Sequence, residues 1–532
     1  MWSRKSGFRT GPTSSFWHDR LVETGLILSL ALYYMVGNQH TVIGYLGRLN
    51  PLLSLPFLLI FTALCWYRLP FAVALLPLWL PYYLLQKAVI SHYAFSMAEI
   101  TLWTCIAVTA LQLFWGQPSC RFFWSQVRER LGPFTLPIII FFLMAAVSVV
   151  IAYAHNTALR AFREEVLDPL LYGGLVLLCL RRREDVLRLL SALLGSALLV
   201  ALLGMAQYIF FKNTLVLEDG IRRVHAVYGS ANSIGLFFDY TLPIGFALLI
   251  AGISWRNRVL AVVVCLPLLF VLYLTQSRGA WLANAIGLLF IVAFSLRNPK
   301  HLLVSGVAVL IVLAVALLFF HSRVVDFVSE GHVSKYGIST VTKRLYLWQS
   351  ALTMIHDSPW LGYGMDNWLC HYSKNMICAA HTFHYWIVTD PVTGKPTGLL
   401  DEPTLSHPHN IFLHVWVSIG MFGLLAFIAI IILFYTLFAQ IMRHLTRVED
   451  GEQLRWMIIG VGAAMSTALV QGQFDSAFLE QDLAFCFWTL VAALLILRPL
   501  SGMAWQAMLP WKRPKQADFT SEQQRTTVPA EV

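Results

Sequence analysis

Long apolar runs and short polar breaks alternate along the chain from residue 21 to residue 497. Most runs hold about 15 to 25 residues, close to the roughly 20 that a helix needs to cross a ~30 Å hydrocarbon core. A membrane β-barrel would instead show strands of alternating hydrophobicity. The pattern predicts an all-α fold, a polytopic transmembrane helical bundle of about 12–14 spans. The weakest spans are 99–115 and 166–180, the second of which contains Asp168 and Pro169.

Composition and charge agree with a membrane protein. Of the 532 residues 58% are hydrophobic and only 12% are charged, and the mean hydropathy is +0.66. These values exclude a string of soluble domains, a nucleic-acid-binding protein and a disulfide-framework secreted domain. The formal net charge of +10 arises from Lys and Arg residues grouped in the polar breaks. Because such groups mark the cytoplasmic side, their alternation places both termini in the cytoplasm.

The same rule divides the chain into five parts. We predict a cytoplasmic N-terminal segment (1–20), a transmembrane bundle (21–320), a long periplasmic loop containing short helices (321–409), C-terminal transmembrane helices (410–497) and a cytoplasmic polar tail (498–532). Basic residues precede the first apolar run, as in a signal sequence, but no small-residue cleavage site follows it. We interpret this run as a retained first helix of a multi-pass protein in a bacterial inner membrane.

A tight polar turn at 275–281 interrupts the apolar region 259–296 and contains Ser277, Arg278 and Gly279. The topology places this turn on the outer side, where the positive-inside rule disfavours an arginine. Two interpretations remain. Arg278 snorkels to lipid headgroups, as most arginines at helix ends do, or it binds a ligand that the small neighbours Ser277 and Gly279 allow to approach.

A second pair of outer arginines, Arg222 and Arg223, lies just ahead of the segment 227–232, Val-Tyr-Gly-Ser-Ala-Asn. One interpretation is a solvated connector with a Gly-Ser turn. The other is a further cationic contact for the same ligand, and the sequence does not decide between them.

Within the long loop, the spacing of Leu345, Trp348, Leu352 and Ile355 predicts an amphipathic helix that ends at Pro359. The apolar stripe favours packing along the bundle over a cofactor-binding role. Arg344 stands just ahead of the stripe, so we expect its guanidinium to reach the outer mouth of the bundle.

The loop ends in His407-Pro408-His409-Asn410, directly before another apolar run. An imidazole that is neutral near physiological pH suits proton transfer from a hydroxyl, and we interpret His409 as that group in preference to an interfacial histidine. We expect Asn410 to fix its ring tautomer, and Asp475, between the last two apolar runs, to orient the base or an arginine. The side chain of His407 is expected to point elsewhere.

Cysteine and histidine spacings give no sign of a metal site. The sequence contains no CxxC and no HExxH pattern, so we predict no metal and no cofactor. Five of the eight cysteines lie in apolar runs, where packing is their expected role. Cys370 and Cys378 lie in the outer loop, where an oxidising compartment permits a disulfide; whether they pair is left open.

The predicted topology, which is derived from the basic loops, places four candidate residues on the outer face of the membrane: Arg278, Arg344, His409 and Asp475. A guanidinium makes bidentate, permanently charged contacts to phosphate oxygens. This set therefore indicates a diphosphate site beside a histidine that activates an acceptor.

At these residues the sequence resembles the bacterial O-antigen ligase and O-antigen polymerase superfamily, a group of lipid-linked glycan glycosyltransferases. The shared features are, in chain order, a loose element at 229–232, the Ser-Arg-Gly turn at 277–279, Arg344 with Trp348, the segment 359–364 and His409-Asn410. The match extends from Arg222 to Asp475, whereas residues 1–200 match only in being helical.

The resemblance implies an inverting, metal-independent glycosyl transfer on the periplasmic face, from an undecaprenyl-diphosphate-linked glycan to an acceptor hydroxyl. It implies donor-diphosphate binding by Arg278, Arg344 and Arg223. It implies that Arg278 and Arg344 also stabilise the leaving group and that His409 acts on the acceptor. Supporting roles would fall to Asn410, Asp475 and Ser277.

Several functions share this arrangement. We favour an O-antigen ligase that joins polysaccharide to lipid A-core, because one long loop entering a His-Asn helix fits it. The alternatives are a polymerase of O-antigen or exopolysaccharide repeat units and a protein oligosaccharyltransferase. A transporter or flippase is disfavoured, because no internal repeat is visible and the ionisable residues gather at the outer edge. The expected partners are the lipid-linked donor, a lipid A-core or glycan acceptor and membrane lipids, with no nucleic acid.

Overall fold

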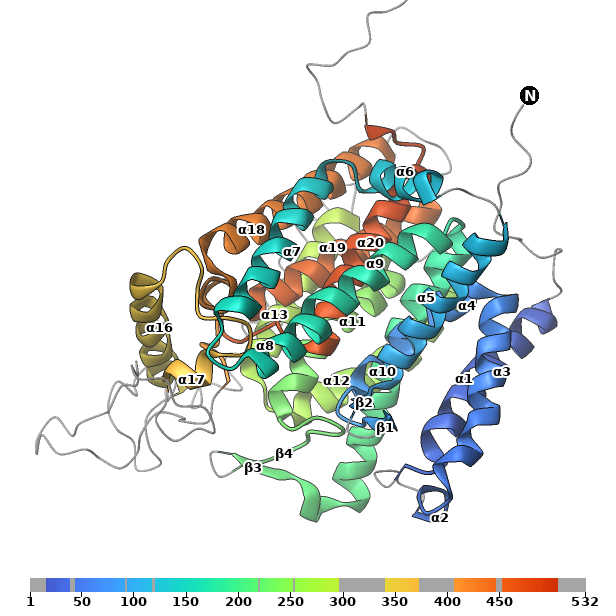
Figure 1. Cartoon of the computed structure of the whole chain (residues 1–532), viewed down its shortest axis with the longest axis horizontal. Coiled ribbons are helices and arrows are strands. Elements are labelled where there is room, and N and C mark those ends of the chain that lie inside the picture. Colours follow the sequence, from blue (N-terminus) through green and yellow to red (C-terminus); the bar gives the residue numbers. More distant parts are fainter. Residues whose placement is uncertain are drawn as a thin grey trace, which may run out of the picture.

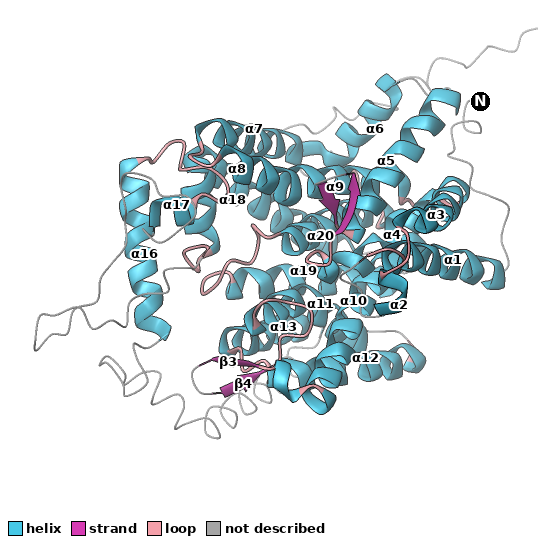
Figure 2. Cartoon of the chain, turned by 60° about the horizontal axis from the view of Figure 1, so that its bottom comes forward, coloured by secondary structure: helices cyan, strands magenta, loops and turns pink. Residues whose placement is uncertain are grey.

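The computed structural model describes residues 16–38, 44–90, 93–116, 120–218, 221–251, 254–295, 340–372, 406–445 and 452–505. Helices dominate the described chain (Figure 2), which confirms the predicted polytopic helical bundle. Two antiparallel hairpins are additions that the apolar pattern did not predict. One pairs β1 (Lys87–Ile90) with β2 (Tyr93–Phe95), and the other pairs β3 (Val216–Glu218) with β4 (Ile221–Arg223).

Nine helices of the described ranges are long and apolar enough to cross a membrane, and a bent pair brings the number to as many as ten. The nine are α5 (Met97–Gly116), α7 (Thr135–Ile151) with the residues from Gln126 before it, α10 (Arg183–Phe210), α11 (Ala231–Ala251), α12 (Trp255–Leu274), α13 (Arg278–Ser295), α18 (Ile411–Leu445), α19 (Glu452–Gln471) and α20 (Gln481–Leu500). The bent pair joins η1 (Pro51–Ser54) and α3 (Leu55–Tyr67) to α4 (Leu69–Leu75) and η2 (Leu76–Tyr82) at 114°.

The two spans expected to be weak have different outcomes. Residues 99–115 lie within α5, one of the nine candidates. Residues 166–180 are only the second half of a longer helical path from α8 (His155–Ala161) through the π-helical turn η4 (Phe162–Leu167) to α9 (Asp168–Cys179). The total of 12–14 spans and the boundaries of the five parts stay predictions, because the apolar run at 301–320 and most of 321–409 lie outside the described residues.

The core of the bundle is formed by α11, α19 and α20. In their most apolar windows 83%, 78% and 89% of the residues are buried, whereas the value for α12 is 28%. A helix that is apolar on every face can be covered by lipid or by other helices, and here other helices cover these three. Accordingly α11 packs against α10, α12, α13 and α19, while α20 packs against α9 and α18.

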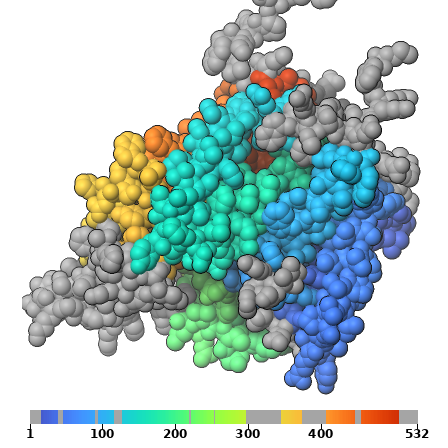
Figure 3. Space-filling view, in the orientation of Figure 1, coloured from blue at the N-terminus to red at the C-terminus, as the bar shows by residue number. Residues whose placement is uncertain are grey.

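The N-terminal helix α1 (Phe16–Met35) packs beside α3 at one edge of the molecule (Figure 3). At the C-terminal end of α1, the ammonium group of Lys87 from β1 donates to the Val36 carbonyl (2.8 Å) and to Ser54 Oγ (2.8 Å). Nearer its start, Glu23 forms an ion pair with Arg188 of α10 at 2.7 Å. Both contacts anchor the edge of the bundle away from the predicted site residues.

The segments that carry the predicted site residues lie at one end of the bundle. Figure 1 shows α6 (Cys120–Leu131) and the C-terminal ends of α18 and α20 at one end, and both hairpins, α16 (Thr340–Asp357) and α17 (Trp368–Tyr372) toward the other. At this second end the Ile411 N–H donates to Gly472 O (2.6 Å), and the Val224 N–H donates to Leu274 O (3.4 Å). The membrane side that this end faces stays a prediction.

The amphipathic helix of the long loop is present as α16, but the predicted packing face is wrong in part. Leu345 and Leu352 are 51% and 53% exposed, whereas Leu347, Ala351, Met354 and Ile355 are buried. The buried set packs against α17 and Val417 of α18. Because Arg344 precedes Leu347 by three residues, both lie on the same helix face, which is the face toward the bundle.

A break in α18 holds this loop in place. Gly420 has φ +75° and ψ −179° inside an otherwise helical run, a conformation that is essentially restricted to glycine. Three main-chain hydrogen bonds from the loop cross to the break: Tyr363 N to Val417 O (2.7 Å), Gly364 N to Ser418 O (3.1 Å) and Met421 N to Pro359 O (3.0 Å). We call these three bonds the α18 clamp; they account for the segment 359–364 that the sequence singled out.

The cysteines largely follow the sequence interpretation. Cys65, Cys105, Cys179, Cys265 and Cys486 are free and buried. Cys370 is disulfide-bonded, and its expected partner, Cys378, lies outside the described residues, so their pairing stays a prediction.

Candidate active site

The connection that enters α18 places His409 in a constrained backbone. Its φ is +51°, in the left-handed region that non-glycine residues seldom occupy and that clusters at functional sites. Its N–H donates to His407 Nδ1 (3.3 Å), and its carbonyl accepts from the Trp348 indole of α16 (3.4 Å). The loop helix and the loop exit are therefore joined at His409.

Asp475 binds the ring of His409. The His409 Nδ1 to Asp475 Oδ1 distance is 2.7 Å, and the same oxygen accepts the backbone N–H of Ser476 (2.9 Å). A carboxylate oxygen that already accepts one N–H acts as an acceptor toward the imidazole as well. The proton of neutral His409 is thus assigned to Nδ1, which leaves Nε2 unprotonated and able to take a proton.

The charge state of Asp475 supports this assignment. Burial by itself would raise the pKa of this carboxyl, but the neighbouring His409, the hydrogen bond from its ring, His407 and Arg344 more than offset the burial. The net effect is a pKa of Asp475 below its ordinary value. Asp475 is therefore ionised throughout the physiological range.

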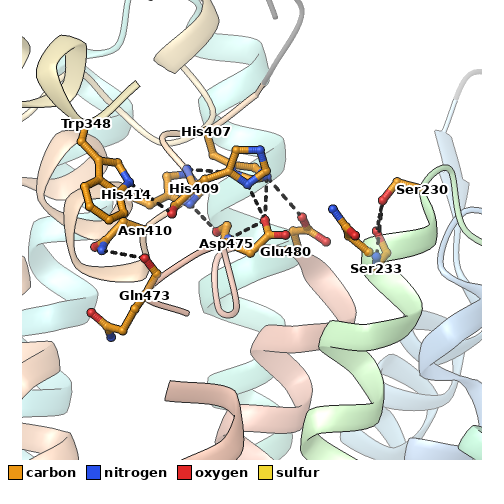
Figure 4. A network of polar contacts seen from close by, with 12 residues as sticks. Ser230, Ser233, Trp348, His407, His409, Asn410, His414, Gln473, Asp475 and Glu480 are labelled. Atoms are coloured by element: carbon orange, nitrogen blue, oxygen red, sulfur yellow. Dashed lines mark hydrogen bonds and ion pairs between the residues drawn. The ribbon is translucent and has the colours of Figure 1, made fainter. Parts of the chain in front are cut away.

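The expectation that His407 points elsewhere is wrong. Its ring packs edge-on against His409 with centroids 4.7 Å apart, and its Nε2 lies 3.9 Å from both Asp475 Oδ1 and Glu480 Oε1 (Figure 4). Burial, followed by the neighbouring His409, lowers the pKa of His407 well below its usual value. The two imidazoles, two residues apart, thus lie in contact just before α18.

Asn410 has a different role from the expected one. Its side-chain oxygen accepts the backbone N–H groups of Phe412 (3.0 Å) and Leu413 (3.1 Å), and its amide donates to Gln473 O (3.3 Å). It therefore caps the N-terminus of α18 and ties this helix to the α19–α20 connection. The ring tautomer of His409 is set by Asp475 instead.

Arg344 reaches the histidine cluster from α16. It is half-buried on the inner face of that helix, and its positive charge is among those that act on His407 and Asp475. Arg344 thus lies at the end of the bundle that holds His409, and the assignment of this end to the outer mouth stays a prediction.

Arg278 begins α13 in the turn that the sequence predicted. Its side chain is exposed and makes no hydrogen bond or ion pair with any residue that the structure describes. The neighbouring Gly279 would place a Cβ 3.9 Å from the side chain of Gln471, one residue before Gly472, which binds Ile411. The turn thus lies against the same connection as the loop exit, with its guanidinium available to a ligand.

Ser277 serves close packing of this turn. It is buried, its N–H donates to Thr275 Oγ1 (3.2 Å), and a Cβ at Gly235 of α11 would lie only 3.3 Å from its Oγ. Small residues on both sides let α11 and the turn approach each other, as the sequence suggested.

Arg223 is tied into the protein. Its Nε donates to Thr275 O (2.6 Å), and its Nη2 donates to Asn232 Oδ1 (2.6 Å). These bonds link β4 to the α12–α13 turn and to the start of α11. A contact from Arg223 to a diphosphate would have to come from its remaining N–H groups, so its predicted binding role is weaker than that of Arg278.

His407, His409 and Asp475 also form the one group of potential metal ligands found in the described part of the chain, with ligand atoms within 4.8 Å of one another. Two ligand atoms at about 2.0–2.1 Å from a tetrahedral ion lie roughly 3.3 Å apart. The 2.7 Å separation of His409 Nδ1 and Asp475 Oδ1 fits a hydrogen bond better. The geometry favours proton transfer over metal binding.

Two neighbours of the site escaped the sequence interpretation. His414, one turn into α18, makes a 2.6 Å hydrogen bond from Nδ1 to Ser476 Oγ, and Glu480 approaches His407 from the α19–α20 connection. The only available signal was the crowding of polar residues between 471 and 482, from which Asp475 alone was selected.

Comparisons with known proteins agree on one group. A family model described as O-antigen ligase matches residues 260–428. A general O-oligosaccharyltransferase from Acinetobacter baylyi is 29% identical over 221 residues, which cover 39% of this chain and 38% of the relative. The match thus spans less than two fifths of the relative's length, and it leaves both proteins with long segments outside the alignment.

Proposed function

We propose, from the match of residues 260–428 to the O-antigen ligase family and the similarity to an O-oligosaccharyltransferase, that this chain transfers a glycan from a lipid diphosphate to an acceptor hydroxyl. The donor would be an undecaprenyl-diphosphate-linked glycan, and the active end would face the periplasm from the inner membrane. The observation that carries the proposal is the His409–Asp475 pair with Arg344 beside it. His409 and Arg344 lie inside the matched family region, and Asp475 lies beyond its end.

The pair supplies general base catalysis. As the acceptor oxygen attacks the anomeric carbon, its proton moves to Nε2 of His409, while Asp475 accepts from Nδ1–H and stabilises the imidazolium that forms. The bond between the anomeric carbon and the diphosphate oxygen breaks, and its electron pair leaves with the diphosphate. A single displacement of this kind inverts the anomeric configuration.

The arginines supply charge stabilisation for the leaving group. Arg278, with its unengaged guanidinium, and Arg344, on the inner face of α16, would hold the diphosphate through bidentate contacts that strengthen as its charge grows. A transporter needs no such division between a base and an anion site, so the arrangement supports an enzyme.

Ligation to lipid A-core, which the sequence favoured, and polymerisation of repeat units differ from protein glycosylation only in the acceptor. The name of the Acinetobacter relative, a general O-oligosaccharyltransferase, favours an oligosaccharyltransferase as the second candidate.

Deleting the gene distinguishes these functions. A ligase deletion should remove the lipopolysaccharide ladder and accumulate lipid-linked glycan, a polymerase deletion should leave single repeats attached, and an oligosaccharyltransferase deletion should leave the ladder intact but remove glycan from protein. Unchanged glycans in all three fractions would refute the proposal.

Metal independence can be tested on the same protein. Because the 2.7 Å hydrogen bond occupies the position between the two strongest ligand atoms, transfer by purified protein should keep its rate in excess EDTA. Loss of activity that Mg²⁺, Mn²⁺ or Zn²⁺ restores would reassign His407, His409 and Asp475 as ligands.

A further inference from the structure

A buried arginine, Arg498, lies at the end of the bundle opposite the candidate active site. It belongs to the last turn of α20, at the end that also holds α6 (Figure 1). Arg498 is 6% exposed, its Nε is buried without a hydrogen-bond partner, and its guanidinium forms no ion pair with any residue that the structure describes. Burying a charged donor without an acceptor is costly. The position therefore indicates an acceptor from outside the described part of the chain.

The segment after α20 holds this guanidinium in place. At Gly502 (φ +80°) the backbone turns back, and the N–H of Met503 donates to Arg498 O (3.2 Å). The ring centroid of Trp505 then lies 4.0 Å from the guanidinium carbon, and the indole N–H donates to Glu129 O of α6 (2.6 Å). A ring that covers the face of a guanidinium occupies none of its N–H donors. Arg498 therefore keeps these donors for a ligand at the edge of the guanidinium.

Two further arginines are fixed beside the same connection. Arg130, next to Glu129 in α6, donates from Nη1 to Leu180 O (3.1 Å) at the C-terminal end of α9. Arg181 donates from Nη2 to Gln126 Oε1 of α6 (2.8 Å). These partners are neutral oxygens, and neither arginine forms an ion pair in the described chain, while Glu129 beside them is exposed. The three guanidinium groups thus form a positively charged site with little counter-charge.

The depth and the chemistry of this site identify a phospholipid headgroup as the acceptor. The candidate membrane span α20 ends at Leu500, which puts Arg498 near the level of the headgroups, where tryptophans such as Trp505 are also common. The planar fork of a guanidinium matches phosphate oxygens in a bidentate contact. A headgroup with a net negative charge fits three arginines best, because they would repel the ammonium group of a zwitterionic one.

We propose that Arg498, flanked by Arg130 and Arg181, binds the phosphate of an anionic phospholipid. The basic loops predict that this end faces the cytoplasmic leaflet, whose surface is negatively charged. A lipid held there joins α6 and the end of α9 to α20 and should therefore stabilise the bundle. The site lies at the end away from His409, so it does not depend on the glycosyl transfer proposed above.

Thermal unfolding of the purified full-length protein tests the site, because a ligand that binds only the folded state raises the melting temperature. The protein in a neutral detergent would receive phosphatidylglycerol, phosphatidylcholine or inorganic phosphate. Phosphatidylglycerol should act at about a tenfold lower concentration than phosphatidylcholine, the difference expected for one charge-assisted contact. Inorganic phosphate should have no effect at the same concentrations. Equal effects of the two lipids, or none of either, would overturn the proposal, and an equal effect of inorganic phosphate would show a site for a free anion instead.

Charge-removing variants locate the effect. Arg498→Met keeps the packing on Trp505 but removes the charge, so the preference for phosphatidylglycerol should fall to about twofold or less. Its melting temperature without lipid should match that of the wild type, because no acceptor in the chain loses a partner. Arg256→Met, which removes an exposed arginine from the start of α12, is the matched control and should keep the full preference.

A second variant decides the matter if Arg498→Met does not fold. Arg181→Gln changes an exposed position and should lower the preference for phosphatidylglycerol to about threefold, as expected when one partly solvated charge is removed. A lower melting temperature of lipid-free Arg498→Met would place the acceptor within the chain itself and overturn the proposal. An unchanged lipid preference in both variants would refute the site.

Discussion

The imidazole of His409 is fixed by three neighbours before any substrate binds. Asp475 holds Nδ1, the ring of His407 packs against its face, and the indole of Trp348 holds the carbonyl of its left-handed backbone. A base with so few accessible orientations reaches the reactive geometry at little entropic cost. The strain at this residue is therefore consistent with a catalytic role.

The His409–Asp475 pair gives a prediction for the chemical step. His409→Ala should lower turnover by about 10² to 10⁴, the range for a lost general base. Asp475→Asn should cause a loss of comparable size, because an amide that donates to Nδ1 selects the wrong tautomer. Turnover and donor binding would be measured with purified protein and lipid-linked donor, and donor binding should stay near wild type. His356→Ala, which removes an exposed imidazole from α16, should keep its activity. Normal turnover in His409→Ala would exclude it as the base.

Arg278 gives a prediction that separates binding from stability. Because its guanidinium has no partner within the described structure, Arg278→Ala should leave the melting temperature unchanged while transfer is lost. Arg278→Lys should recover little, since an ammonium lacks the bidentate fork. Arg222→Ala, at an exposed position in β4, serves as the control. Full activity of the lysine variant would show that only a point charge is needed.

The sequence was sufficient to select a candidate site residue where its residue type has few common roles at that position. An arginine in an outer turn and a histidine at a membrane entry have few common functions, so Arg278, Arg344 and His409 could be selected. His407 and Glu480 could not, because their proximity to the base depends on the left-handed backbone at His409 and on how the α19–α20 connection folds. The role predicted for Asn410 was wrong for a similar reason. An asparagine beside His409 could either cap α18 or contact the imidazole, and the sequence does not distinguish the two.

At the scale of elements, the break in α18 determines where the loop helix lies. Gly420 sits in an apolar run whose periodicity gives no sign of a break, so the sequence predicted one uninterrupted span. The register of α16 was wrong for a related reason. Its packing partners, α17 and Val417, come from other segments, and isolated spacing could not choose between adjacent helix faces. The two hairpins are too short to produce a recognisable alternation.

Gly420→Ala should therefore disrupt the site without altering any site residue. An alanine at φ +75° and ψ −179° costs about 1–3 kcal/mol in backbone strain, and its Cβ would also overlap the carbonyl of Trp360. Thermal unfolding in detergent should shift to lower temperature and transfer should fall together with it. Gly174→Ala is the matched control, because a Cβ there meets no atom within 4 Å and alanine favours a helix. Equal stability of the two variants would show that the clamp does not hold the loop.

For the whole molecule, the pattern of apolar runs was sufficient to predict a helical membrane bundle, while burial within it was not predictable. The sequence of α20 resembles that of a lipid-facing helix, yet it lies in the core. The orientation in the membrane rests on the basic loops alone and stays a prediction.

Cysteine labelling checks this orientation directly. Arg222→Cys and Glu184→Cys place thiols at exposed positions in β4 and at the start of α10, which the positive-inside rule assigns to opposite sides. In intact spheroplasts a membrane-impermeant thiol reagent should label the first above the parent background but not the second. Five native cysteines should contribute little background because they are buried: Cys65, Cys105, Cys179, Cys265 and Cys486. Reversed labelling would place the active end in the cytoplasm and exclude a periplasmic reaction.

The α18 clamp has a consequence for how such enzymes diversify. Its three bonds join main-chain atoms only, so the joint depends on glycine conformations and hardly on side-chain identity. Within the loop, Leu361 is 43% exposed, and Trp360, 60% exposed, stacks on Phe422 of α18. We therefore expect that side chains of the segment 359–364 can vary while Arg344, Trp348 and His409 keep their places, provided that its glycines and Gly420 are kept.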